Sequence, residues 1–260
     1  MKLKLILSSI TIVILLGGFA IHQTTDVNNR KTITKRQNIK KVLSKNDIER
    51  INNKFYSHKI EQQSAAIDFV NYPSTFSGLV NSGELTIEGK ITGLESYVFE
   101  NRPYTIAAVT INKVLHGDKS QLNKTIRVMF LGGNITRKEM LAAANYPSNS
   151  SDDSNSEEIV TVEEENNRLP KAGERLAMVL SKLPAGTNNI PGKFWSPAFA
   201  YKSVFFRNSN GEYKRIPEAK SIGGGFRGST STNQLNQEDD EKMNNGMNAL
   251  INKDVLHKVR

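Results

Sequence analysis

Three consecutive segments in the middle of the chain constrain the fold most. The segment 85–93 (LTIEGKITG) alternates apolar residues and glycine with threonine, glutamate and lysine, as a half-buried strand does. The segments 104–115 (YTIAAVTINKVL) and 125–131 (TIRVMFL) follow it after polar turns and are rich in β-branched residues. This order predicts a mainly β fold with flanking helices.

Further β-like segments extend this domain to residues 79–222. A short helix is predicted over 137–145, followed by strands over 175–180 and 197–206, and the Asn210-Gly211 pair indicates a hairpin to 213–216. Three strands, a short helix and then more strands is the order of an OB-like barrel, a small five-stranded Greek-key barrel. We therefore expect an OB-like small β-barrel after an N-terminal signal or anchor helix.

Short motifs in these segments give the same expectation by resemblance. The pair Gly89-Lys90, the strand end 114–118 (VLHGD) and the later 172–176 (AGERL) occur in the expected strand order. Over about 79–183 the chain resembles the OB-fold netrin/tissue-inhibitor-like domains and their exported bacterial relatives. The resemblance implies a non-catalytic binding or inhibitory module. It transfers no site residue, because the animal inhibitors act through an amino-terminal cysteine and this chain has none.

Residues 1–21 have the pattern of an export signal. Lys2 and Lys4 precede an uncharged, mostly apolar run over 5–21, and small residues near its end allow cleavage after Ala20. The run would span about 25 Å as a helix, at the lower limit for a bilayer core of about 30 Å. Residues 1–21 are therefore either a cleaved signal peptide or a membrane anchor. We expect an exported protein, facing outward on the cell membrane or secreted if cleaved, and the absence of cysteine favours a bacterial envelope.

A strongly basic segment follows the leader. We interpret residues 22–45 as a tether whose cations would attract anionic envelope polymers or lipid headgroups, although they could equally keep a linker extended. Export argues against nucleic acid as a partner. The basic side chains are Arg30, Lys31, Lys35, Arg36, Lys40 and Lys41.

Three other segments have less regular patterns. A capping box at Ser44 and Asp47 starts a helix that we predict over 46–70. Acidic and small polar residues dominate 148–167, which predicts a flexible insertion, because such a segment buries too little apolar area to fold. Residues 223–260 are predicted to be a flexible tail in which a short helix could form.

The sequence offers little catalytic chemistry. The four histidines are scattered, no ligand set for a metal is evident, and the GGGFRG motif over 223–228 lacks the strand–helix context of a nucleotide site. We therefore expect no enzyme, no metal and no cofactor. Aromatic residues concentrate over 194–206, where Trp195, Tyr201 and Phe205 form either core or a platform for a peptide or glycan.

These observations predict a membrane-tethered extracytoplasmic binding protein, with an open possibility of a protein partner. The alternative is a secreted inhibitor or modulator of a cell-envelope enzyme. The membrane contact would be made through residues 5–21.

Overall fold

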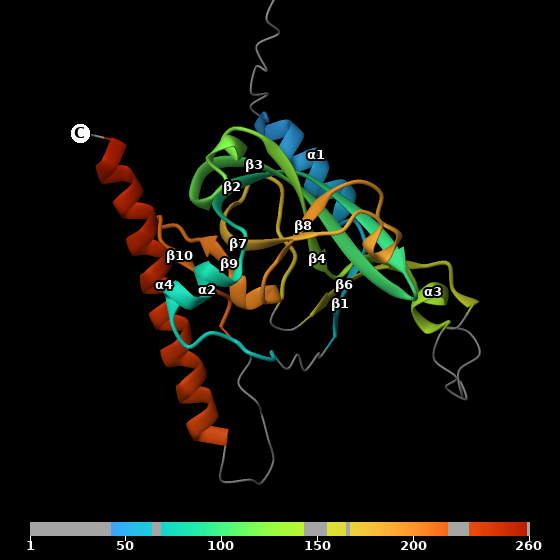
Figure 1. Ribbon diagram of the computed structural model, residues 1–260. Helices are drawn as coiled ribbons and strands as arrows, with labels where there is room; N and C mark the ends of the chain where they lie inside the picture. Colours follow the sequence, from blue (N-terminus) through green and yellow to red (C-terminus); the bar gives the residue numbers. More distant parts are fainter. Residues whose placement is uncertain (1–42, 64–68, 143–154, 165–166, 218–228, 259–260) are drawn as a thin grey trace, which may run out of the picture. The chain divides into compact units, whose positions relative to one another are not determined.

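The protein is mainly β, with two sheets and flanking helices (Figure 1). The computed structural model describes residues 43–63, 69–142, 155–164, 167–217 and 229–258. The helices are α1 (Lys45–Phe55), α2 (Phe76–Ser82), α3 (Arg137–Leu141) and α4 (Ser229–Lys258). The strands are β1 (Lys59–Gln63), β2 (Leu85–Phe99), β3 (Arg102–Gly117), β4 (Thr125–Leu131), β5 (Gly133–Thr136), β6 (Ile159–Glu164), β7 (Arg175–Leu183), β8 (Phe194–Pro197), β9 (Val204–Arg207) and β10 (Tyr213–Lys214). No helix in these ranges is both long enough and apolar enough to span a bilayer.

Five strands of the larger sheet pair in a closed ring. β2, β3 and β4 are antiparallel neighbours, as the three predicted segments require, and β4 has the predicted bounds. β4 then pairs in parallel with β8 at Val128 and Trp195. β8 pairs with β7, and β7 pairs with β2, both antiparallel, so the ring β2-β3-β4-β8-β7 returns to its first strand.

One face of this ring encloses the main apolar core. Alternate residues of β2, β3, β4 and β7 are buried there, together with Phe55 from α1. Gly89 lies on this face beside a register shift of β2, where an added Cβ would lie 2.6 Å from the Val109 side chain. Glycine is required at this close approach of two strands. The fully buried aliphatic side chains of this core include Leu85, Ile87, Ile91, Ile111, Leu176, Met178 and Leu180.

A second core lies on the outer face of β7 and β9, where α2 and α4 cover the sheet (Figure 1). Met243 and Met247 of α4 are fully buried against Phe205 of β9. An added Cβ on Gly246 would lie 2.2 Å from Cγ of Phe76, so the two helices approach closely at this glycine.

The prediction of a flexible tail over 223–260 is wrong for residues 229–258, which form α4. Its buried residues Met243, Met247 and Ile251 repeat every four positions, which aligns them on one face of a helix. This apolar stripe is narrow and lies in an asparagine-rich segment, so the composition concealed it. Residues 223–228 lie outside the described ranges.

The predicted helix over 46–70 is shorter than expected. The capping box at Ser44 and Asp47 is confirmed, but α1 ends at Phe55, whose side chain enters the main core. Lys59–Gln63 instead forms β1, which pairs in parallel with β6. The pairing of segments a hundred residues apart overrides the local helical pattern.

The acidic segment 148–167 also contains a strand that we did not predict. β6 lies between β1 and β5 in a three-stranded sheet, and Val160 and Val162 alternate into a small core with Ile135 of β5. These apolar contacts and two strand partners supply the burial that the acidic flanks lack. Residues 148–154 and 165–166 lie outside the described ranges.

The predicted strand over 197–206 is interrupted. β8 ends at Pro197, a 3₁₀ turn spans Ala200–Ser203, and β9 begins at Val204. Ala200 has a positive φ of 40°, which no continuous strand contains. The hairpin predicted at Asn210-Gly211 is confirmed by the antiparallel pairing of β9 with β10.

Candidate functional site

The three predicted aromatic site residues do not form one surface. Phe205 is fully buried in the second core, so its assignment to a binding platform is wrong. Trp195 of β8 packs against the main core. Tyr201 is 9% exposed and makes an edge-on contact with Phe69, with ring centroids 5.6 Å apart. The prediction assumed one continuous strand over 197–206, in which alternate side chains share a face. The 3₁₀ turn at Ala200–Ser203 breaks that alternation between Tyr201 and Phe205.

Tyr201 belongs to a different aromatic group. The rings of Phe69, Tyr72 and Phe199 contact one another in edge-to-face or tilted pairs, with centroid distances of 5.3–6.1 Å. Tyr201 joins this group through its contact with Phe69. The ammonium of Lys202 lies 5.7 Å from the Tyr201 ring and 6.0 Å from the Tyr72 ring, within the range of cation–π attraction.

A buried arginine joins this aromatic group to α4. The guanidinium of Arg215 donates to the Tyr72 hydroxyl at 2.6 Å and to Oδ2 of Asp239 at 3.0 Å, and it lies 3.4 Å from Oδ1 of Asp240. Burial raises the pKa of Tyr72 to about 12, and the positive charge of Arg215 opposes that rise. The Arg215 side chain is fully buried. We therefore assign Arg215 to fixing α4 and not to binding a ligand.

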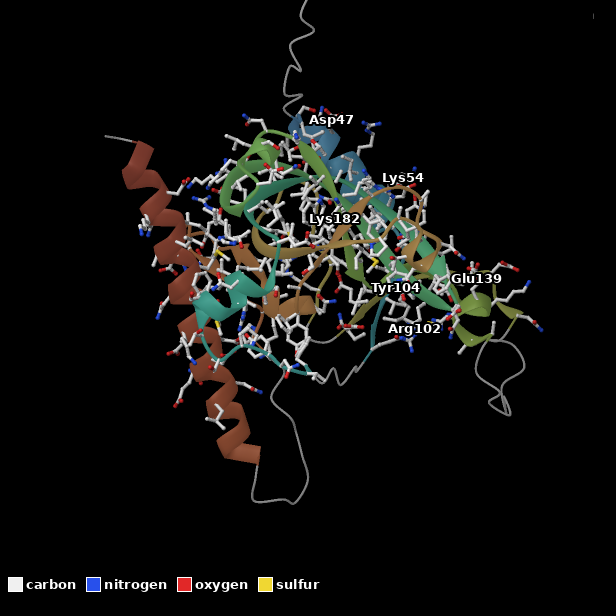
Figure 2. The ribbon with its side chains drawn as sticks, in the orientation of Figure 1. Asp47, Lys54, Arg102, Tyr104, Glu139 and Lys182 are labelled. Atoms are coloured by element: carbon white, nitrogen blue, oxygen red, sulfur yellow. The ribbon has the colours of Figure 1, made fainter. Side chains whose placement is uncertain are left out.

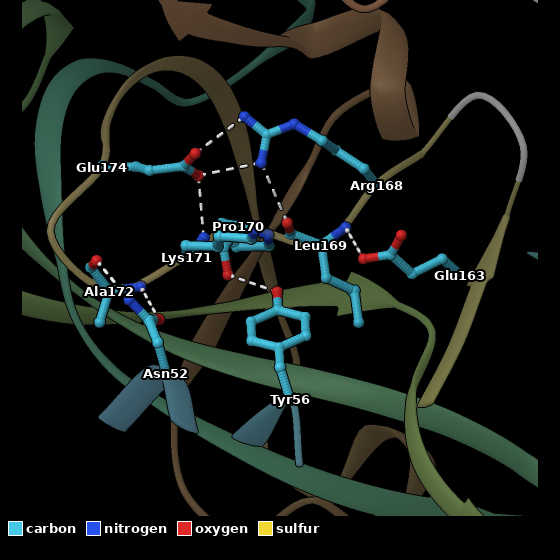
Figure 3. A network of polar contacts seen from close by, with 9 residues as sticks. All are labelled: Asn52, Tyr56, Glu163, Arg168, Leu169, Pro170, Lys171, Ala172 and Glu174. Atoms are coloured by element: carbon cyan, nitrogen blue, oxygen red, sulfur yellow. Dashed lines mark hydrogen bonds and ion pairs between the residues drawn. The ribbon is translucent and has the colours of Figure 1, made fainter. Parts of the chain in front are cut away.

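A second polar network fixes α1 to the loop between β6 and β7 (Figure 3). Asn52 accepts from the amide of Ala172 at 2.8 Å and donates to its carbonyl at 3.1 Å. Tyr56 donates to the carbonyl of Pro170 at 3.0 Å. In the same loop, Arg168 forms a two-point ion pair with Glu174. Helix α1 is therefore joined to the β domain by side-chain hydrogen bonds from two of its residues.

The described residues contain no arrangement suited to nucleophilic or metal chemistry. His58 lies 3.3 Å from the hydroxyl of its neighbour Ser57, but Ser57 is exposed, His58 is only partly buried, and no hydrogen bond in the described ranges joins the ring to a carboxylate. No group of three or more His, Asp or Glu side chains able to hold a metal ion occurs in the described ranges.

The six basic tether residues, from Arg30 to Lys41, lie outside the described residues. The β domain carries its own cluster of cations, on the outer face of β2, β3, β7 and β9. Lys90 of β2 lies directly opposite Arg175 of β7. Phe206 of β9 lies opposite Leu176 of β7, and both side chains contact the main core. Successive side chains of a strand point to opposite faces, so the neighbouring residues Arg207 and Arg175 share the outer face. We call Lys90, Lys113, Arg175 and Arg207 the cationic face.

One carboxylate lies among these cations. Glu88 of β2 is opposite Lys113 of β3, and its side chain is only 5% exposed. Oε2 of Glu88 lies 3.4 Å from Nζ of Lys113, and Oε1 lies 3.6 Å from Nη1 of Arg175. Lys90 and Arg207 form no ion pair with any acid in the described ranges. The cationic face therefore holds four cations and one buried carboxylate, which pairs with only two of them.

Tyr213 of β10 provides a second measure of this arrangement. Burial raises the pKa of the Tyr213 hydroxyl, and the negative charge of Glu88 raises it further. Arg207 and Arg175 both act in the opposite direction, which places the two guanidinium groups near the same hydroxyl. Arg207 of β9 and Arg175 of β7 thus both act on one buried hydroxyl.

Sequence reasoning missed the cationic face. The alternation over 85–93 placed Lys90 on the polar side of its strand, but nothing local gave the register that brings Arg175 and Arg207 beside it.

No protein-family model and no curated protein sequence matches this chain.

Proposed function

We propose that this protein is an exported, membrane-tethered binding protein that acts outside the cytoplasm. The separation of charge along the chain carries the proposal. Residues 1–42 contain eight basic side chains and one acidic one, which supplies seven of the nine net positive charges. Residues 43–260 contain the other 27 basic and 25 acidic side chains and are nearly neutral. Attachment to an anionic surface would thus reside in the segment that also holds the apolar run over 5–21.

The contacts of α1 with the β domain support the interpretation of residues 22–45 as a tether. The described chain starts just before α1, and Asn52, Tyr56 and Phe55 fix that helix to the β domain. A force applied through the tether would therefore be transmitted through α1 to the β domain.

The closed ring of strands supports the finer proposal that residues 79–222 form an OB-like barrel. The five strands β2-β3-β4-β8-β7 match the number expected of that fold, and the parallel pairing of β4 with β8 closes the ring. OB-like barrels commonly serve as binding modules, and a binding role is also what the resemblance to netrin/tissue-inhibitor-like domains implies.

The proposal is tested by locating the intact chain in cells. Cells expressing the protein with a carboxyl-terminal tag are fractionated, and wall-stripped cells are treated with protease. We expect the tag in the membrane fraction, digestible from outside, on a protein that retains its leader. A tag protected from protease in intact stripped cells would overturn export. A supernatant form beginning at Ile21 would favour the secreted modulator instead.

A second variant separates anchoring from electrostatic attachment. Replacing the six tether cations by glutamine should leave an anchored protein in the membrane pellet but shorten its retention on stripped wall material. A variant that replaces exposed Lys54, Lys182 and Lys193 instead serves as the control, because it removes charge from the domain only.

A further inference from the structure

We propose that the cationic face binds the phosphoryl oxygens of an anionic polymer. Lys90, Lys113, Arg175 and Arg207 are its residues, and the ligand class is a chain of phosphates or phosphodiesters. The inference deepens the proposed function and relies on it only for the polymer being one of the cell envelope. A basic tether attracts any polyanion, whereas this face offers a fixed arrangement of donors.

The first argument is the energetic cost of the face in the free protein. Side chains directly opposite each other on neighbouring strands have Cβ atoms about 5 Å apart, and like charges in this position are destabilising. Lys90 and Arg175 are such a pair. Arg207 follows the residue opposite Leu176 and adds a third cation to the same row. An anion bound across this row would relieve the repulsion.

The second argument concerns the role of Glu88. One carboxylate neutralises one of four cations, and Glu88 is 5% exposed while Arg175 is 50% exposed. The carboxylate therefore lies beneath the cationic ends and orients Lys113 and Arg175 from below. A ligand approaching from solvent meets the guanidinium and ammonium groups first. Arginine in particular presents paired N–H donors that fit phosphate oxygens.

The third argument is the length of the row. Beyond Lys90, the same row continues to Thr110 of β3 and Thr125 of β4, whose hydroxyls lie 2.9 Å apart. Neighbouring strands are about 4.8 Å apart, so the path from β9 to β4 along the curved outer surface of the ring is roughly 19 Å long. This length accommodates several successive phosphates, and a single phosphate ion would occupy only part of it. The row therefore favours a polymer.

The test uses the full-length chain with long-chain polyphosphate as the probe. Because the tether would bind this probe as well, all variants are made with the six tether cations replaced by glutamine. The test variant adds Lys90→Gln, Arg175→Gln and Arg207→Gln. The matched control adds Lys54→Gln, Lys182→Gln and Lys193→Gln, which removes the same charge from exposed positions elsewhere. Figure 2 labels Lys54 and Lys182. Affinity is measured by calorimetry at several salt concentrations.

We expect the test variant to bind about tenfold or more weakly, with a salt dependence reduced by about three charges, and the control to stay within about twofold. Equal loss in both variants, or no loss in either, would overturn the proposal. The single variant Arg207→Gln provides a second measurement of affinity. Arg207 is exposed and takes no part in the Glu88 ion pairs, so this substitution should preserve folding. It should weaken binding in the same direction.

Further probes separate the sources of phosphate. Vesicles of phosphatidylglycerol should bind the test and control variants equally, and a preference of vesicles for the control would assign the face to lipid and overturn the polymer. Single-stranded DNA bound more tightly than polyphosphate would likewise overturn it in favour of nucleic acid. Failure here leaves the cell fractionation result unchanged, so the two proposals fail separately.

Discussion

Asn248 of α4 bonds both backbone groups of Tyr213 in β10. The amide of Tyr213 donates to Oδ1 of Asn248 at 2.9 Å, and Nδ2 of Asn248 donates to the Tyr213 carbonyl at 2.9 Å. One turn earlier, Asn244 accepts from the amide of Arg215 at 2.9 Å. Side-chain amides of a helix thus continue the hydrogen bonding of the sheet past its last strand. An edge that could otherwise pair with another chain is covered.

Asn248→Ala should lower the free energy of unfolding by about 1–3 kcal/mol, because it leaves two partly buried backbone groups without their partner. Urea unfolding measures the difference. Asn245→Ala is the matched control, since Asn245 is exposed on the same helix and should change stability by less than about 0.5 kcal/mol. Equal effects of the two substitutions would show that α4 does not protect this edge.

Gly246→Ala should destabilise the protein although alanine favours helices over glycine by about 1 kcal/mol. The added Cβ would lie 2.2 Å from Cγ and 2.6 Å from Cβ of Phe76, so α2 and α4 must separate. Such overpacking costs about 1–3 kcal/mol, which exceeds the helical gain. Thermal unfolding is compared for Gly246→Ala in the natural protein and in a Phe76→Gly background, because alanine at position 76 would keep the Cβ that lies 2.6 Å from the added methyl group. If Gly246→Ala destabilises the Phe76→Gly background as much as the natural protein, the close approach of the two helices is not the reason.

Asn52→Ala should loosen α1 from the β domain. The substitution removes two hydrogen bonds to Ala172 and should cost about 1–3 kcal/mol. Amide hydrogen exchange would then quicken in α1 first and in β2 and β3 least. The neighbouring Asn53 is exposed, and Asn53→Ala should leave exchange in α1 unchanged. Uniform acceleration across the whole domain would contradict a local role of Asn52 in fixing α1 to the β domain.

Local signals predicted the central part of the fold well. The bounds of β4, the capping box at Ser44 and the hairpin at Asn210-Gly211 each depend on a few adjacent residues, and each is confirmed. Period-two alternation also placed Gly89 on the core side of β2, where a close strand contact requires it.

The features that escaped prediction depend on distant partners. β1 and β6 are weak strands by themselves and gain stability from pairing with each other, with Lys59 opposite Val160. α4 becomes a long helix because a sheet face is available to its methionines. The cationic face requires the register of β9, β7 and β2, which no single segment encodes. The local pattern left Phe205 open between core and platform, because its burial in the core that α4 covers cannot be seen locally.

The carboxyl group of Glu164 should make stability depend on pH. Burial raises the pKa of Glu164, while a hydrogen bond from Asn167 and the charge of Arg102 oppose the rise. Oε2 of Glu164 is buried and has no hydrogen-bond partner. A carboxyl group whose pKa is higher in the folded state holds its proton more tightly there. Its favourable contribution is therefore complete below the unfolded-state pKa of about 4.3 and is lost as pH rises through the folded-state pKa.

Glu164→Gln should consequently stabilise the protein at pH 7 by up to about 1 kcal/mol, because it removes a buried charge with an unsatisfied oxygen. The difference from the natural protein should shrink as pH falls toward about 4, where both side chains are neutral. Urea unfolding across this range measures it. Glu95→Gln, at an exposed position of β2, is the control and should show no such convergence. A constant difference at all pH values would assign the effect to shape or hydrogen bonding and not to the buried charge.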